Sequence, residues 1–214
     1  MPPPATLPSP APTSSPAPGA QTHDGFYLRL QLGGGYTRLS SSMNGTDRSS
    51  AGNSTAFAIA LGGALTPHVI LYGTLLDSTI RDPDNTFSGI SPDSSSNHGR
   101  FTGSLDAGGF GATGMVGIGV GVAYYLDSNL FVAGSLLASR LFINNTNGGV
   151  VSTSEAGFTL EGLVGKEWWV SANWGLGASG RLLLGSMKDR PVANEAVPTW
   201  KLAAFAVLFS ATYN

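Results

Sequence analysis

The stretch from Gly157 to Ser186 alternates larger apolar residues with small or polar ones on both sides of a short turn around Ser171. A period of two is typical of β-strands, because successive side chains of a strand point to opposite faces of the sheet. Glu161 and Arg181 both lie ten residues from that turn, so we expect them to face each other across a hairpin. The opposite face at this depth carries Leu160, Gly162, Gly180 and Leu182. Because the alternation recurs along the chain, it predicts an all-β fold.

Eight alternating segments follow one another from Gly25 to the end of the chain. Three of their connections are tight turns, at Thr66-Pro67-His68, at Asp127-Ser128-Asn129 and around Ser171. The other four are long and polar, at about 40–54, 81–108, 144–155 and 187–198. Long and short connections alternate along the chain, which predicts an antiparallel up-and-down sheet. Because the number of strands is even, we expect both termini at the short-turn end.

One face of most strands carries large apolar residues, and the other carries Gly, Ala, Ser and a few charged residues. Pairing around Ser128 places Gly119 opposite Leu137 and Gly121 opposite Ser135, a match of small and large residues that suits a narrow, filled interior. The third strand runs from about residue 69 to residue 80. Here we expect Asp77 to point inward and four residues to point outward: Ile70, Tyr72, Thr74 and Leu76.

Composition decides what surrounds this sheet. Charged residues make up 11% of the 214 residues, against about 25% in ordinary soluble domains. The longest apolar run, residues 115–126, has twelve residues, which is short of the roughly 20 of a membrane helix. A soluble lipocalin-like barrel is the main rival, but it would carry Lys and Glu along its outer face. The sequence therefore predicts an eight-stranded antiparallel up-and-down transmembrane β-barrel over residues 25–214.

The remaining residues, 1–24, form a Pro/Ala/Ser-rich tract, which we expect to be a disordered leader on the periplasmic side. A net charge of −2 gives no basic surface for nucleic acid. The absence of cysteine excludes a cysteine-based metal site, and the acidic residues at 82–85 lack the spacing of a calcium loop. We therefore expect no metal and no cofactor.

Aromatic residues gather near the strand ends, as in the interfacial girdles of membrane barrels. Those expected in the girdles are Tyr27, Tyr72, Tyr124, Trp168, Trp169, Trp174 and Tyr213 at the short-turn end and Trp200 at the long-loop end. Three cationic residues, Arg38, Arg140 and Lys201, would then meet the outer leaflet. We expect no charge on the lipid face at mid-membrane.

With these patterns, the chain resembles the small outer-membrane β-barrels of the OmpA transmembrane-domain and OmpX type. The segments that carry the resemblance are GIGVGVAYYL, GKEWWVSANWGLG and the terminal strand FAVLFSATYN. The resemblance covers about residues 25–214. It implies a monomer in the bacterial outer membrane, with periplasmic termini and extracellular long loops. Its partners would be outer-membrane lipids, lipopolysaccharide and the barrel-assembly machinery. That machinery usually reads a terminal aromatic residue, whereas Tyr213 is penultimate here.

Four charged residues fall on strand phases assigned to the interior: Arg29, Asp77, Glu161 and Arg181. One interpretation is an internal ion pair that fills a closed barrel and fixes the strand register. The other, implied by the resemblance, is a narrow polar path gated by a Glu161–Arg181 salt bridge.

The preferred function is a structural or surface-interaction role through the extracellular loops, with a small pore as the alternative. A lipid A-modifying enzyme is less favoured, because its nucleophile, base and acid would have to meet at the outer rim. Of the three histidines, His23, His68 and His98, only His98 falls on that side of the predicted barrel. We expect no catalytic residues.

Overall fold

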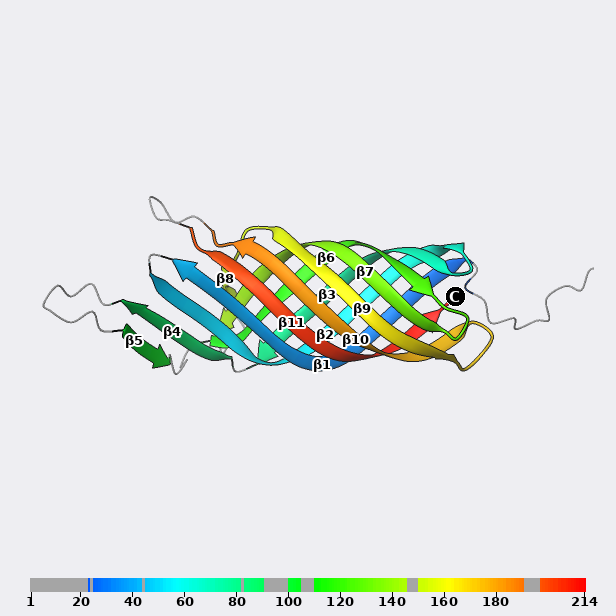
Figure 1. The fold of residues 1–214 in the computed structure, drawn as a ribbon, viewed down its shortest axis with the longest axis horizontal. Helices are drawn as coiled ribbons and strands as arrows, with labels where there is room; N and C mark the ends of the chain where they lie inside the picture. The colour runs from blue at the N-terminus through cyan, green and yellow to red at the C-terminus, as the bar shows by residue number, and fades with distance from the viewer. Residues whose placement is uncertain are drawn as a thin grey trace, which may run out of the picture.

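The computed structural model describes residue 23 and residues 25–43, 45–81, 83–90, 100–104, 110–145, 150–190 and 197–214. Apart from His23, the expected leader lies outside the described residues. Within the described part, β-strands are the regular secondary structure, and short turns join them (Figure 1). The strands are β1 (Phe26–Met43), β2 (Thr46–Thr66), β3 (Val69–Arg81), β4 (Asp84–Ile90), β5 (Arg100–Ser104), β6 (Phe110–Tyr125), β7 (Leu130–Asn145), β8 (Val150–Thr153), β9 (Gly157–Trp169), β10 (Trp174–Lys188) and β11 (Thr199–Tyr213).

Eight of the described strands close into a ring of antiparallel pairs. Their order is β1-β11-β10-β9-β7-β6-β3-β2, and β2 pairs with β1 to complete the circle. The closing contact between the first and last strands runs from Leu28 opposite Tyr213 to Ser41 opposite Trp200. The predicted fold class, an eight-stranded antiparallel β-barrel, is confirmed.

The long connections contain more strand than we expected. The predicted loop at 40–54 is wrong, because β1 and β2 stay paired from Phe26 opposite Gly63 to Met43 opposite Thr46. Gly45 takes the positive φ of 76° that this tight turn requires. The other long connections contain β4 and β5, which extend the sheet from β2, and β8, which pairs with β7. In Figure 1, β4 and β5 lie at the end of the molecule opposite to the C-terminus.

The third strand has the opposite phase to the one predicted. Ile70, Tyr72 and Leu76 are buried in the interior, whereas Leu71 and Leu75 are exposed on the outer wall. The register explains the choice, because Tyr72 lies between two inward glycines, Gly62 of β2 and Gly121 of β6. These glycines leave the space that an inward tyrosine ring needs in a barrel of this size.

The hairpin of β9 and β10 is centred one residue later than predicted. Its turn comprises residues 170–173, so that Glu161 pairs with Leu183 and Arg181 pairs with Leu163. The expected direct opposition of the two charged residues is therefore wrong. They lie diagonally across the hairpin, and both remain on the inward face.

Two buried apolar clusters fill the barrel interior. The cluster toward the short turns comprises Tyr27, Ala56, Ala60, Ile70, Tyr72, Ala123, Tyr125, Phe131, Leu163, Ala206 and Leu208. The cluster toward the long connections comprises Leu39, Ala58, Leu76, Met115, Leu137, Leu141, Leu183, Met187, Leu202 and Ala204. Each cluster draws residues from opposite sides of the ring, as expected where the lumen is packed with side chains.

We predict that Gly121→Val destabilises the barrel, because a Cβ at this position would lie 2.6 Å from Cζ of Tyr72. Overpacking of this kind costs about 1–3 kcal/mol. Unfolding in urea, followed by tryptophan fluorescence in lipid vesicles, measures the loss. Gly162→Val is the matched control: a Cβ at Gly162 meets no atom within 4 Å, so stability should not fall. Equal losses in both variants would contradict the packing argument.

Candidate functional site

The charged residues of the interior form two groups, and the first is centred on Arg29 of β1. Its Nη2 lies 3.0 Å from Oε1 of Glu167 on β9 and also donates to the hydroxyl of Tyr125 on β6. Thr212 donates a hydrogen bond of 2.7 Å to the same Glu167 oxygen. Because β1, β6 and β9 are not neighbours in the ring, Arg29 links separate parts of the barrel wall.

Aromatic rings enclose the Arg29 guanidinium. Its Cζ lies 4.2 Å from the ring centroid of Phe131 and 5.3 Å from that of Tyr27. A guanidinium over aromatic faces gains electrostatic attraction in a site that excludes water. Toward the short-turn end, the interior thus holds a cation that is paired with a carboxylate and packed against aromatic rings.

The second group contains the predicted pair of Glu161 and Arg181. Arg181 Nε lies 2.9 Å from Glu161 Oε1, at ion-pair distance but outside hydrogen-bond geometry. The hydroxyl of Ser135 donates a hydrogen bond of 2.7 Å to the other carboxylate oxygen of Glu161. The same hydroxyl lies 3.0 Å from the hydroxyl of Tyr72. Nη2 of Arg181 donates a hydrogen bond of 3.1 Å to Oε1 of Gln31. The structure therefore places Arg29, Glu161 and Arg181 inside the barrel, in two sets of polar contacts.

Sequence reasoning missed Glu167, the partner of Arg29. The signal was present in the alternation of β9, because Glu167 follows Glu161, Leu163 and Gly165 on the inward phase. It was overlooked because the charged residue lies next to Trp168 and Trp169, which mark the strand end. Counting the period of two up to the turn would have assigned it to the lumen.

Asp77 does not belong to the interior, and its predicted place in the lumen is wrong. It lies on the outer face of β3, between Phe57 of β2 and Val116 of β6. Its carboxylate accepts hydrogen bonds of 2.9 and 3.0 Å from the hydroxyl of Thr79 on the same strand. The reversed phase of β3 that brings Tyr72 inward necessarily turns Asp77 outward.

The expected girdle separates into outward and inward aromatic residues. Tyr124, Trp168 and Trp174 are exposed on the outer wall. Trp169, Trp200 and Tyr213 are partly exposed, and Trp200 packs against the interior cluster near the long connections. Tyr27 and Tyr72 are buried in the lumen, so their assignment to the girdle is wrong. Both residues lie toward the short-turn end of the barrel, but the phase of each strand points them inward.

Both described histidines lie at the short-turn end. His23 is buried, its Nδ1 is 2.9 Å from Oδ1 of Asn214, and its ring centroid is 3.8 Å from that of Tyr125. His68 lies in the β2–β3 turn, with its Nδ1 3.0 Å from the carbonyl of Tyr125. His98 lies outside the described residues. Among the residues that are described, no three acidic or histidine side chains are arranged to hold a metal ion.

The outer wall is apolar along the middle of every ring strand. Its exposed residues include Leu30, Leu32, Leu61, Leu71, Leu75, Ile118, Val120, Val132, Leu136, Leu160, Val164, Leu176, Leu182, Val207 and Phe209. Across the described residues, no helix has the length and apolar character to cross a membrane. A closed ring of paired strands with an apolar outer wall satisfies the hydrogen bonds of its main chain in lipid. The chain has the fold of the small eight-stranded outer-membrane β-barrels.

Solved structures similar to this chain include three barrels at low sequence identity. Neisserial surface protein A is 15% identical over 87% of this chain and 96% of that chain, with a TM-score of 0.48. OprG from Pseudomonas aeruginosa is 10% identical over 91% and 99%, with a TM-score of 0.48. Ail of Yersinia pestis is 9% identical over 89% and 99%, with a TM-score of 0.45. No protein-family model and no curated protein sequence matches the chain.

We predict that Arg181→Ala lowers the free energy of unfolding by about 3–5 kcal/mol, because it leaves Glu161 buried without its partner. Removing both charges, with Arg181→Met and Glu161→Leu together, should cost less than the single change. Urea titrations of each variant in lipid vesicles measure both effects. Arg140→Ala, at an exposed position, should change stability by less than about 0.5 kcal/mol. If Arg181→Ala is as stable as the wild type, the ion pair of Glu161 and Arg181 has no structural role.

Proposed function

We propose that this chain is an integral protein of the bacterial outer membrane with a closed lumen and a structural or surface-interaction role. Its termini face the periplasm, and its extended connections face outward. Outer-membrane lipids and lipopolysaccharide surround a monomeric barrel, which the barrel-assembly machinery inserts. The observation that carries this proposal is the filling of the lumen by two apolar clusters with an ion pair at their junction.

The position of the central ion pair supports a closed lumen. Arg181 pairs in register with Leu163, a member of the short-turn cluster, and Glu161 pairs with Leu183, a member of the other cluster. The ion pair therefore lies where the two clusters meet. A continuous water path would have to separate Glu161 from Arg181 and also pass packed apolar side chains on both sides. Eight strands enclose just enough space for such side chains, which favours a plug over a gate.

The long strands support a role at the outer surface. A transmembrane strand needs about 9–11 residues, whereas β1 has 18 and β2 has 21. On β1 the outward apolar residues end at Tyr36, and the strand continues from Arg38 to Met43. Beyond the lipid-facing band, β1 and β2 thus form a projecting hairpin, to which β4 adds a further strand. Surfaces displayed in this way are suited to contacts with molecules outside the cell.

The first test is planar-bilayer conductance of the purified barrel. We predict no discrete current steps for the wild type, and none for Arg181→Ala, because the apolar clusters still fill the lumen. Steps in the wild type would favour the small-pore alternative. Steps that appear only in Arg181→Ala would identify the Glu161–Arg181 pair as the gate. The first result would contradict the closed lumen, and the second would contradict a lumen that the apolar clusters keep filled without the ion pair.

The second test determines location and orientation by cysteine labelling, for which the chain is suited because it contains no cysteine. Ser42→Cys places a thiol on the projecting hairpin, and Ser128→Cys places one in the β6–β7 turn; both positions are exposed. In intact Gram-negative cells, an impermeant maleimide should label Ser42→Cys alone. Ser128→Cys should react only after the outer membrane is permeabilised. Labelling in the reverse order would contradict the proposed orientation, and a detergent-free soluble product would contradict the membrane location.

A further inference from the structure

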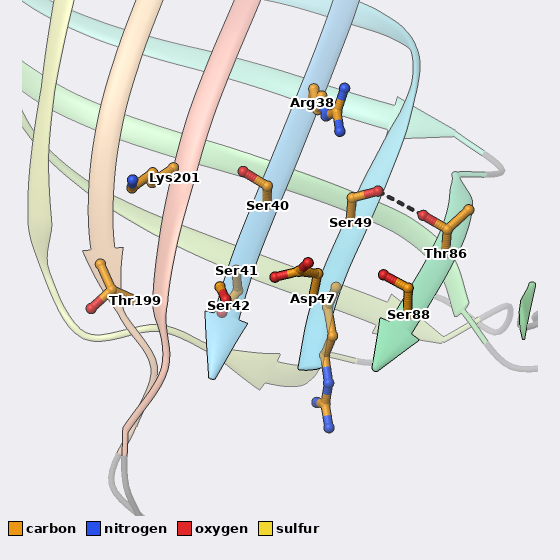
Figure 2. A pocket seen from close by; sticks show the side chains of 11 residues that line it. Arg38, Ser40, Ser41, Ser42, Asp47, Ser49, Thr86, Ser88, Thr199 and Lys201 are labelled. Carbon is orange, nitrogen blue, oxygen red and sulfur yellow. Dashed lines mark hydrogen bonds between the residues drawn. The ribbon is translucent and has the colours of Figure 1, made fainter. Parts of the chain in front are cut away.

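A polar groove lies on the outer wall, where β11, β1, β2 and β4 run side by side (Figure 2). It has a volume of about 670 Å³. Its described lining combines seven hydroxyl side chains and three cationic ones with a single acid, and it includes Arg38, Ser40, Ser49, Thr86 and Lys201. This combination differs from the apolar wall that adjoins it.

The strand register explains why these side chains meet. Lys201 of β11 pairs with Ser40 of β1, Ser40 pairs with Ser49 of β2, and Ser49 pairs with Thr86 of β4. One row across four strands therefore presents an ammonium group followed by three hydroxyls on the same face. The hydroxyls of Ser49 and Thr86 lie 2.7 Å apart and are joined by the hydrogen bond drawn in Figure 2.

Arg38 adds a second cation one step closer to the membrane. It pairs with Ala203 of β11 and Ala51 of β2, whose small side chains leave its guanidinium accessible. Outward residues placed diagonally on paired strands have Cα atoms about 7–8 Å apart, so Arg38 and Lys201 are within reach of one anionic group. Figure 2 shows the two side chains on neighbouring strands at the groove.

Among the residues that the structure describes, the cations of the groove have no ion-pair partner. Within the described residues, the three ion pairs involve neither Arg38 nor Lys201 nor Arg48. The only acid in the lining is Asp47, so the four charged residues sum to +2. Arginine and lysine bind phosphate oxygens through charge-assisted hydrogen bonds, and arginine can do so with two parallel donors.

The groove also continues directly into the lipid-facing wall. The next outward residues below Arg38 and Ala203 are Tyr36 and Phe205, which pair with each other and are both exposed. A molecule held by the cations would therefore rest its apolar part against this wall. The row of hydroxyls lies on the side away from the membrane, where it can hydrogen-bond to sugar hydroxyls.

We propose that this groove binds the phosphorylated sugar head group of an outer-leaflet lipid, with Arg38 and Lys201 on the phosphate and Ser40, Ser49 and Thr86 on the saccharide. The site deepens the proposed function and rests on the membrane orientation given there. It requires neither an open lumen nor a closed one. The acyl chains of the same lipid would cover Tyr36 and Phe205.

Native mass spectrometry of the full chain in detergent micelles tests the proposal, with diphosphoryl lipid A as the probe. The double variant Arg38→Gln with Lys201→Gln should bind this lipid about tenfold more weakly than the wild type, equivalent to about 1.4 kcal/mol. Ser49→Ala with Thr86→Val should weaken lipid A binding but leave binding of phosphatidylglycerol, which has a phosphate and no sugar, unchanged. Unchanged heat-dependent migration on gels shows that each variant is folded.

Arg140→Gln is the matched control, because Arg140 is an exposed cation on the outer face of β7 and pairs with Val116 instead of a hydroxyl residue. It should bind lipid A as the wild type does. Wild-type affinity in the Arg38 and Lys201 double variant would overturn the site. If Arg140→Gln lost as much affinity for lipid A as the double variant, the binding would be nonspecific attraction between cations and an anionic lipid. The same conclusion would follow if the serine and threonine variant lost as much affinity for phosphatidylglycerol as for lipid A. The labelling experiment tests the orientation separately, so failure of the site and failure of the proposed function can be told apart.

Discussion

Closure of the ring by β1 and β11 is the constraint on which the rest of the structure depends. An open sheet edge in lipid would leave main-chain groups without hydrogen-bond partners, and pairing the first strand with the last removes both edges. Closing at eight strands also fixes a lumen that side chains fill. Tyr72 illustrates the fit, because its inward ring lies between Gly62 and Gly121 on the two neighbouring strands.

Burying charge in such a lumen is tolerable only because each charged group has a partner. Arg29 contacts Glu167 across the barrel, and Arg181 contacts Glu161 across a hairpin. A one-residue slip of any of these strands would turn a charge onto the lipid face, at a cost of roughly 2–4 kcal/mol for a cation near the midplane. The paired charges therefore help to define the register, whereas the apolar clusters supply most of the packing.

The alternation of residues was sufficient to predict the eight ring strands, because in most of them one face is clearly larger and less polar. It failed for β3, where Ile70 and Leu71, and again Leu75 and Leu76, place similar residues on both faces; only the neighbouring glycines decide the phase. It failed for the serine-rich hairpin beyond Arg38, since a strand with two polar faces has no contrast to detect. The diagonal placement of Glu161 and Arg181 depended on a turn centre that composition does not specify.

The projecting β1–β2 hairpin has a thermodynamic consequence for any molecule that binds at this end of the barrel. Its main chain is held by continuous cross-strand pairing as far as Met43 and Thr46, and β4 is joined to its side. A mobile loop loses conformational freedom when a ligand fixes it, and that loss subtracts from affinity. In the β1–β2 hairpin, the main chain is already ordered when the protein has folded. The hairpin can thus behave as a rigid template, whose contacts contribute to affinity without a further entropic penalty for the backbone.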